Sequence, residues 1–437
     1  MIRLALLLLG ARALRSLWPL LVLMGALWCG LSLWLLANLH SPDVVYVEDV
    51  LAAFLALEGT VHVLAAVILG FRRHVGELVR GLSFLLAAFL IFNVEWDHNL
   101  GATVVFGTAF LVDGLLKAGS AYVLRGEPLI ANLSRALFSV VMAIVIFTRW
   151  PLPHEVTVPF CLALLFLFSG IALLRAGLQL RRLPLGGSIT GLPVYAAINW
   201  QARGIAVPPV AAESPRTGQT LHVRIWTAMG SAADPQRRFL VDRYVAAVDR
   251  KGVVSTGHSA MELPPDLYIS HYPGVEIDHR PDELRSILHA GPRNDVKGRF
   301  QPSLAYEISQ WCQPDQTVTF HRFNDAALRA FWQLYSRDDT YNLTARNCST
   351  TVILALDAAT EGLASTGRPL RDFLRLTFNP DFWMLRLVRG RAESMTWTPG
   401  LVLDYARLLN QVLEHGQQRW RDTLGAALSS DGASDDR

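Results

Sequence analysis

The sequence predicts a membrane-embedded bundle of six helices followed by a soluble domain of mixed α and β structure. Hydrophobic residues make up 51% of the 437 residues and charged residues only 18%, a balance too apolar for an ordinary soluble enzyme. The apolar residues are concentrated before Leu185 and the charged residues after it, so the two halves belong in different surroundings. A net charge of +3 is too small to indicate an anionic partner.

Six apolar segments in the first half have lengths near the ~20 residues that cross a bilayer core. We place them near 17–39, 50–70, 81–95, 102–124, 136–149 and 157–179, within a membrane domain at 1–182. A leucine-rich stretch at 1–10 precedes them. Because no cleavage site follows it, we expect it to run along the membrane interface into the first span.

Basic residues alternate between the connections of these segments. They are concentrated before the first, between the second and third, near the fourth-to-fifth connection and after the sixth: Arg3, Arg12, Arg15, Arg72, Arg73, Arg80, Lys117, Arg125, Arg135, Arg175, Arg181 and Arg182. The other connections are mainly acidic, with Arg149 the exception. The positive-inside rule then predicts a multi-pass protein of a bacterial inner membrane, with both termini and the soluble domain in the cytoplasm. Its four cysteines would stay reduced there.

An internal repeat links three glycines, each preceded by an acidic or hydroxyl residue. Gly59, Gly114 and Gly170 recur at sequence intervals of 114−59 = 55 and 170−114 = 56. Each repeat would be one helical hairpin, in which the glycine allows close helix approach. Over about residues 15–180 this half resembles the HdeD-type acid-resistance membrane family, which is built from three such hairpins. The resemblance implies a stress-linked inner-membrane protein.

Two of the repeats carry an acid–base pair at the same depth. Glu58 and His62 are four residues apart, and Asp113 and Lys117 have the same spacing, with both members shifted by 113−58 = 55 along the sequence. Ionisable groups within a span usually face a bundle interior or a polar cavity. The pairs could respond to protons or a ligand, form a polar clasp between hairpins, or serve a transporter or channel.

The second half begins with a linker or membrane-surface segment at 183–219 and ends with a tail at 429–437 that is disordered by composition. Between them, 220–428 forms the soluble domain. The pattern predicts strands at 221–228, 253–263, 267–272 and 317–323, with the middle two joined as an antiparallel hairpin at Pro264-Pro265. Helices are expected at 326–335, 369–376 and 400–423 and after Cys348.

Cys348 stands where an irregular polar segment turns into an apolar helix. Asn347 is a suitable N-cap for that helix. The positive end of the helix would favour a thiolate, and the backbone N–H of Cys348 is a candidate donor to an oxyanion. The alternative is a structural cysteine buried in a core.

Two histidines could complete a catalytic set with that cysteine. His258 and His271 fall on the two strands of the predicted hairpin, at a sequence separation of 271−258 = 13, almost opposite each other. One imidazole would act as base and then acid for Cys348, and the other would orient it. Three further residues compete for the orienting role: Asp278, His279 and His321.

The ordered set of motifs at 256–262, 341 and 347–351 resembles the circularly permuted NlpC/P60 papain-like group, in which a strand histidine precedes the cysteine. The elements are similar to those of the Lnb N-terminal and lecithin:retinol acyltransferase-like branches. Over about 220–365 this resemblance implies a papain-like α+β fold and cysteine hydrolase chemistry. By position, Cys348 would be the nucleophile, His258 its base and His271 the third residue.

The sequence departs from those branches at two points. Lnb-type domains are generally periplasmic, whereas the charge pattern here places the domain in the cytoplasm. Acyltransferase-like members follow Asn-Cys with Glu-His, whereas Ser349 and Thr350 stand here, so lipid acyltransfer is not implied.

These patterns predict an inner-membrane cysteine hydrolase, a peptidase or amidase, whose partners are the bilayer and a membrane-proximal peptide, protein or lipid substrate. The alternatives are a thiol acyltransferase or lipid acyl hydrolase, and a non-enzymatic stress-response protein whose soluble domain binds partners. No cofactor or metal is expected, because the chain lacks a phosphate-binding glycine loop and a compact ligand set. The sequence has no basic, aromatic-rich segment suited to binding nucleic acid. It leaves open whether the chain forms a homo-oligomer.

Overall fold

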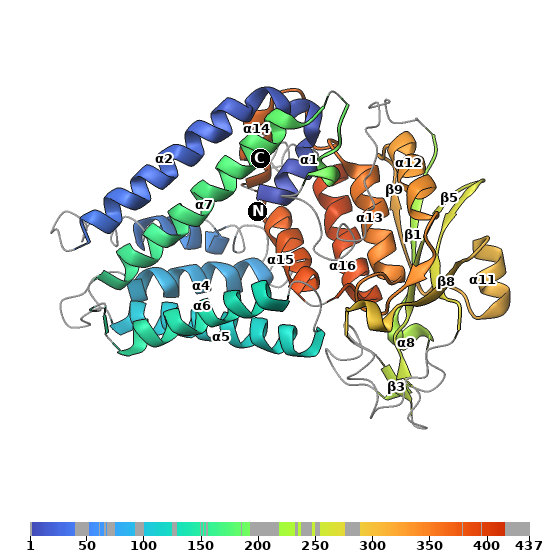
Figure 1. The fold of residues 1–437 in the computed structure, drawn as a ribbon, viewed down its shortest axis with the longest axis horizontal. Coiled ribbons are helices and arrows are strands. Elements are labelled where there is room, and N and C mark those ends of the chain that lie inside the picture. Colours follow the sequence, from blue (N-terminus) through green and yellow to red (C-terminus); the bar gives the residue numbers. More distant parts are fainter. Residues whose placement is uncertain are drawn as a thin grey trace, which may run out of the picture. The chain divides into compact units, whose positions relative to one another are not determined.

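The structure, a computed structural model, describes residues 2–39, 52–60, 62–64, 67, 75–91, 100–124, 129–148, 150–151, 153, 156–184, 186–192, 218–231, 235–236, 247–249, 254–275, 289–377, 379–394 and 396–415. The chain forms two compact units (Figure 1). The helical unit comprises Pro19–Tyr122 and Leu129–Gly177. The cysteine unit comprises Met1–Trp18, Val123–Pro128 and Leu178–Arg437.

Apolar helices form at all six segments predicted to be hydrophobic. They are α2 (Trp18–Ala37), the helix Ala52–Leu64, α4 (Val75–Ile91), α5 (Leu100–Leu124), α6 (Leu129–Thr148) and α7 (Thr157–Arg182). Among the described residues, three stretches are long and apolar enough to cross a membrane: Arg3–Ala37, Thr103–Tyr122 and Pro159–Arg182. The chain therefore has several apolar helices suited to a membrane.

The repeat glycines lie where two helices cross closely. A Cβ atom added at any of them would collide with the backbone of a neighbouring helix. At each crossing the added Cβ would lie close to a carbonyl oxygen of the other helix. The distances are 2.9 Å from Gly59 to the oxygen of Gly81, 3.2 Å from Gly114 to that of Ala136, and 2.8 Å from Gly170 to that of Gly25.

The crossing partners repeat along the chain as the glycines do. Gly25, Gly81 and Ala136 follow one another at sequence intervals of 81−25 = 56 and 136−81 = 55. Each glycine thus packs against the next repeat, and the third packs against the first. The three repeats close into a ring, which explains why small residues recur at this spacing.

The main sheet of the cysteine unit has four antiparallel strands in the order β6-β5-β1-β9. The strands are β1 (Leu221–Trp226), β5 (His258–Leu263), β6 (Leu267–Ile269) and β9 (Gln316–Phe320). Alternate residues of β1 are buried, among them Leu221, Val223 and Ile225, which gives the sheet one apolar face. A second sheet has the order β10-β8-β7, formed by β10 (Thr340–Tyr341), β8 (Val296–Phe300) and β7 (His271–Pro273). A third, small sheet joins Pro235–Gln236, Ala247–Asp249 and Val254–Ser255.

The predicted hairpin around Pro264-Pro265 is confirmed, with Leu263 opposite Leu267 in the β5–β6 ladder. The placement of the two histidines opposite each other was wrong. After Ser270 the chain leaves the main sheet, and β7 (His271–Pro273) pairs with β8 (Val296–Phe300) instead. His258 is paired with Trp226 of β1, and His271 with Phe300 of β8.

Helix α13 (Cys348–Thr360) is the central helix of the cysteine unit, and all of its residues are buried. It packs against β5, α12 (Asp325–Tyr335) and α16 (Pro399–Asn410). Its buried Asp357 accepts two hydrogen bonds of 2.8 Å from Arg389 of α15 (Pro380–Ser394). A buried charge needs such pairing, so this bidentate contact fixes α15 on α13.

The N-terminal stretch differs from the expected interfacial lead-in. It forms α1 (Ile2–Leu14), whose leucines at 4 and 6–9 are buried in the cysteine unit. Gly10 has a φ of 76° and interrupts the helix. The carbonyl oxygens of Leu7 and Leu8 accept instead from the N–H groups of Gly362 and Ala364, both at 2.9 Å.

Several elements of the cysteine unit were not anticipated, namely β8, α11 (Leu304–Gln310) and α15. Helix α14 (Pro369–Thr377) is close to its predicted range, whereas α16 ends at Asn410 and passes into a π-helical turn, Gln411–His415. The remainder of the 400–423 prediction, the segment 193–217 and the tail at 429–437 lie outside the described residues.

Candidate active site

Cys348 is the first residue of α13, and the backbone before it is held rigidly. Asn347 is the N-cap residue, and its Oδ1 accepts from the N–H of Thr350 at 2.8 Å. Its Nδ2 donates to the carbonyl oxygens of Leu343 (2.7 Å) and Trp397 (3.1 Å). The helix start, with its partial positive charge, is therefore fixed beside the sulfur.

The Cys348 thiol is buried among polar groups. The Ser349 hydroxyl lies 3.8 Å from its Sγ, and the His258 side chain and the backbone N–H of Ser259 act on the sulfur electrostatically. Burial raises the pKa of the thiol, but the charge and hydrogen bond of His258 and the Ser259 N–H lower this pKa below its ordinary value. The site thus favours a thiolate, the reactive form of cysteine.

His258, the first residue of β5, lies between the thiol and a carboxylate. Its Nε2 is 2.9 Å from Oγ of Ser270 and 3.3 Å from Oε1 of Glu307, which leaves Nδ1 for Cys348. Its ring packs between Trp226 (5.4 Å between centroids) and Tyr272 (4.5 Å). Burial lowers the pKa of the imidazole, but Cys348 and Glu307 outweigh it and raise this pKa to about 9.

Glu307 of α11 occupies the position expected for His271. Its carboxylate is 5% exposed and accepts from the hydroxyl groups of Tyr268 and of Ser270, the latter at 2.7 Å. Burial raises the pKa of Glu307, but the hydrogen bonds and charge of His258 and the two hydroxyls lower it overall. A carboxylate that is ionised at neutral pH beside Nε2 orients the ring and stabilises its charged form.

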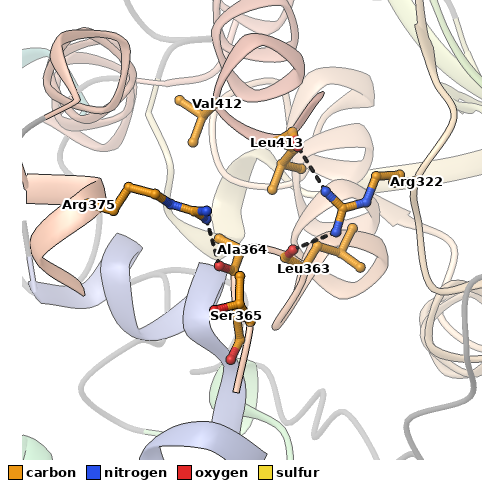
Figure 2. A pocket seen from close by; sticks show the side chains of 8 residues that line it. Arg322, Leu363, Ala364, Ser365, Arg375, Val412 and Leu413 are labelled. Atoms are coloured by element: carbon orange, nitrogen blue, oxygen red, sulfur yellow. Dashed lines mark hydrogen bonds between the residues drawn. The ribbon is translucent and has the colours of Figure 1, made fainter. Parts of the chain in front are cut away.

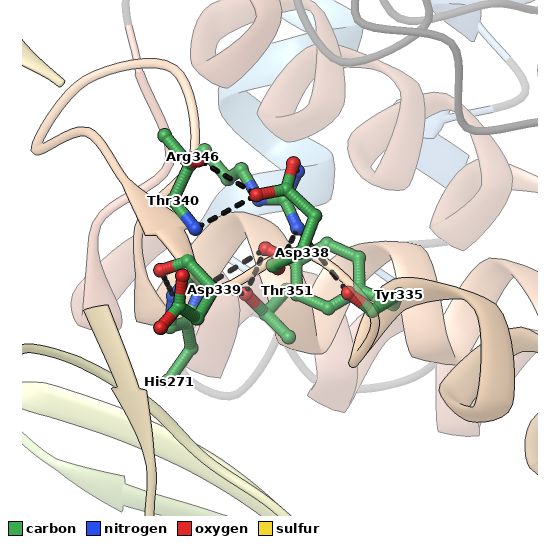
Figure 3. A network of polar contacts seen from close by, with 7 residues as sticks. All are labelled: His271, Tyr335, Asp338, Asp339, Thr340, Arg346 and Thr351. Carbon is green, nitrogen blue, oxygen red and sulfur yellow. Dashed lines mark hydrogen bonds and ion pairs between the residues drawn. The ribbon is translucent and has the colours of Figure 1, made fainter. Parts of the chain in front are cut away.

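His271 lies in a different polar network, which also includes Tyr335, Asp339 and Thr351 (Figure 3). Its Nδ1 is 3.1 Å from the Tyr335 hydroxyl and 3.4 Å from Oγ1 of Thr351, and its Nε2 is 3.3 Å from the carbonyl oxygen of Asp339. Both ring nitrogens are therefore engaged away from His258. Burial lowers the pKa of His271 to about 4, so this ring is neutral. The network ties β7 to α12 and α13.

Of the other candidates for the third role, the structure describes only His321, which does not reach the site. His321 follows β9, is exposed, and its backbone N–H donates to Glu414 at 2.6 Å. Asp278 and His279 lie outside the described residues.

Tyr341 of β10 (Thr340–Tyr341) lies beside the backbone of Cys348. The Cys348 N–H, the group expected to bind an oxyanion, acts on the Tyr341 hydroxyl to lower its pKa. The tyrosine is buried, and burial raises the pKa of its hydroxyl well above the ordinary value. It therefore stays protonated and is able to donate.

Sequence reasoning missed Glu307 and Ser270, and it placed Tyr341 in a motif without giving it a role. Ser303 caps α11 through the N–H of Tyr306, so a helix at that place could have been anticipated. Nothing in the sequence pairs Glu307 with His258, because the two positions are far apart along the chain.

A small pocket of about 30 Å³ lies at the opposite end of α13 (Figure 2). Arg322 donates to the carbonyl oxygens of Leu413 (3.0 Å) and Leu363 (2.9 Å), and Arg375 donates to that of Ala364 (3.0 Å). The arginines thus hold the loop after α13. The 13-residue helix separates this pocket from Cys348 by roughly 20 Å.

The two acid–base pairs, Glu58–His62 and Asp113–Lys117, form contacts within the helical unit. His62 Nε2 is 3.7 Å from a Glu58 carboxylate oxygen, and Lys117 donates to Asp113. The Ser139 hydroxyl also donates to Asp113, at 2.7 Å. These contacts fit a polar clasp, and a proton-responsive role stays a prediction.

Within the described residues, no group of three or more His, Cys, Asp or Glu side chains is arranged to hold a metal ion. No family model, curated protein or solved structure matches this chain. Its function is therefore inferred from the chemistry of the site.

Proposed function

We propose that the cysteine unit is a cysteine hydrolase that cleaves amide or peptide bonds in membrane-proximal substrates. The observation that supports this most strongly is the position of buried His258, with Cys348 on one side and Glu307 on the other. A nucleophile, its base and a group that orients the base define a catalytic triad by geometry and roles. Glu307 takes the role that the sequence had suggested for His271.

In the first step, the Cys348 thiolate attacks the substrate carbonyl carbon, and the carbonyl oxygen becomes an oxyanion. The Cys348 N–H would donate to that oxyanion, and the Tyr341 hydroxyl would turn to donate to the same atom. Two preorganised donors at one oxygen are the arrangement that stabilises such an intermediate.

In the second step, protonated His258 gives its Nδ1 proton to the leaving amine, the C–N bond breaks and an acyl-thioester remains on Cys348. Neutral His258 then takes a proton from water, and the resulting hydroxide attacks the thioester. Collapse releases the carboxylic acid and regenerates the thiolate and imidazolium. Throughout, Glu307 stays ionised and keeps the ring oriented through Nε2.

We assign the cysteine unit to a permuted papain-like fold. A cysteine at the start of a buried helix, packed on an antiparallel strand that carries the base, supports this assignment. We further propose six spans in a bacterial inner membrane, with both termini in the cytoplasm and an HdeD-type stress role. The ring of three glycine-linked repeats supports the relation to that family.

The same acyl-thioester would serve two related reactions. A lipid ester would load Cys348 by the same attack, and an amine or alcohol acceptor in place of water would make the protein an acyltransferase. Incubating the protein with peptide and lipid-ester substrates, with and without an amine acceptor, separates these outcomes by the product that forms.

Labelling by a thiol-directed acyl probe tests whether Cys348 is the nucleophile. Cys348→Ala should abolish labelling. Cys312→Ala is the matched control and should retain it, because Cys312 is partly exposed and burial raises the pKa of its thiol. Full labelling of Cys348→Ala would contradict the proposal and favour a non-enzymatic, partner-binding unit.

A further inference from the structure

Helix α14 turns three apolar side chains outward, while Asp372 and Leu376 are buried. Leu370, Phe373 and Leu374 are 58%, 37% and 48% exposed. Asp372 is 1% exposed and accepts from the N–H and the hydroxyl of Thr366, at 2.6 and 2.7 Å. Because a helix in contact only with water shows the opposite pattern, this exposed apolar side requires an apolar environment.

Helix α15 extends this apolar surface. Trp383, Met384 and Leu387 are 37%, 45% and 62% exposed, while Phe382 is buried toward the core. The Trp383 indole N–H donates to the carbonyl oxygen of Thr377 at 2.6 Å, which ties α15 to the end of α14. The six exposed residues form what we call the α14–α15 face: Leu370, Phe373, Leu374, Trp383, Met384 and Leu387.

Two exposed arginines flank this face, whereas Asp372 and Glu393 are each engaged by a partner within the unit. Arg368 and Arg371 are exposed beside the apolar side chains of α14. Asp372 caps the turn before α14, and Glu393 accepts from Arg389 at 2.7 Å. An apolar surface with an arginine rim is complementary to acidic lipid headgroups above acyl chains.

The chain itself connects this region to the membrane helices. Helix α14 packs against α1, which continues through Arg15–Leu17 to Trp18 at the start of α2. Arg181, near the end of α7, places its guanidinium 4.9 Å from the centre of the Trp18 ring. Helices α2 and α7 both belong to stretches that are apolar enough to span a membrane. Tryptophan and arginine side chains are typical of the bilayer interface.

We propose that the α14–α15 face rests on the acidic surface of the lipid bilayer. Its six apolar side chains would enter the boundary between headgroups and acyl chains, and Arg368 and Arg371 would contact lipid phosphates. This docking would hold the cysteine unit against the membrane and keep Cys348 near membrane-borne substrates. It does not depend on the hydrolase activity.

A photo-crosslinking experiment on the full-length protein tests the proposal. A benzophenone amino acid replaces Phe373 or Leu387 in protein reconstituted into nanodiscs of phosphatidylcholine alone or with phosphatidylglycerol. The matched control replaces Tyr306 of α11, an aromatic residue that is 42% exposed. After irradiation, mass spectrometry counts lipid adducts.

We expect lipid adducts at 373 and 387 to exceed those at 306 by about tenfold or more. Phosphatidylglycerol should increase them, and a double Arg368→Gln, Arg371→Gln variant should lose that increase. Equal lipid labelling at all three positions would overturn the proposal. Crosslinks to protein instead of lipid would also overturn it, because the helical unit or a second copy would then cover the face.

Discussion

His258 and His271 are both buried, and both belong to strands that pack on α13, yet their pKa values move in opposite directions. The pKa of His258 is raised to about 9, because Cys348 and Glu307 outweigh burial. The pKa of His271 is lowered to about 4, because hydroxyl groups and a single carbonyl do not offset burial. Burial disfavours the protonated imidazole of both histidines, and the neighbouring groups decide whether the ring is nevertheless protonated.

This difference arises because the chain leaves the main sheet after Ser270 and enters the second sheet at His271. Ser270 contributes its hydroxyl to the site of His258, and the next residue already belongs to β7. Had the β5–β6 ladder continued, the two histidines would have lain on neighbouring strands. We therefore assign catalysis to His258 and fold stability to His271.

The largest expected effect separates the two histidines directly. His258→Ala should reduce the rate of acyl-probe labelling at pH 7 by about 100-fold or more, because it removes the base and the stabilising charge. His271→Asn should change that rate by less than about threefold. Intact-protein mass spectrometry over a time course measures both rates, and equal losses would contradict the assignment.

A smaller effect is expected from the group that orients His258. Glu307→Gln should slow labelling by roughly 10- to 100-fold and raise the pKa of Cys348, because the imidazolium loses its carboxylate. Glu262→Gln is the matched control. Its carboxylate lies on β5, the strand of His258, and pairs with Arg224 at 2.7 Å. Labelling at the wild-type rate in both variants would exclude the orienting role of Glu307.

His271 should affect stability in a pH-dependent way. Its pKa is lowered from 6.5 to about 4, so the unfolded chain binds more protons at this residue between those values. The free energy of unfolding should therefore fall as the pH decreases through this range, by roughly 3 kcal/mol if the group titrates alone. Above 6.5 the contribution is complete.

The His271→Gln variant lacks this titrating group, so its comparison with the wild type measures the contribution of His271 to stability at each pH. The variant should be less stable than the wild type at pH 7, because it disrupts a buried hydrogen-bonded network. The difference in Tm between the two proteins in detergent should then shrink toward pH 4. A difference that is constant with pH would show that His271 titrates at an ordinary value.

The smallest effect concerns the hydroxyl that joins His271 to α13. Thr351 Oγ1 lies 2.8 Å from the Tyr335 hydroxyl and donates to the carbonyl oxygen of Asn347 at 2.9 Å. Thr351→Val keeps the shape and should cost about 1 kcal/mol of stability, with labelling of Cys348 unchanged. A large loss of labelling would show that the two networks act as one.

The parts of this molecule that were predictable are those set by local patterns. Apolar runs placed the six helices, the two prolines at 264–265 placed the hairpin, and Asn347 marked the start of α13. Each of these depends on residues close together in the chain.

The parts that were not predictable depend on tertiary contacts. The strand switch after Ser270 cannot be read from the alternation of residues, because both halves continue as extended chain. Glu307 comes from a seven-residue helix whose inward face is defined only by what it packs on. The burial of α1 in the cysteine unit likewise arises from its pairing with 362–364, far along the chain.

The pH dependence of Cys348 alkylation, followed by peptide mass spectrometry in the wild type and in His258→Ala, tests the central claim most directly. We predict an apparent pKa below the ~8.5 of an ordinary thiol in the wild type, and a clear rise in the variant, because the imidazolium stabilises the thiolate. An apparent pKa at or above ~8.5 in both proteins would contradict it.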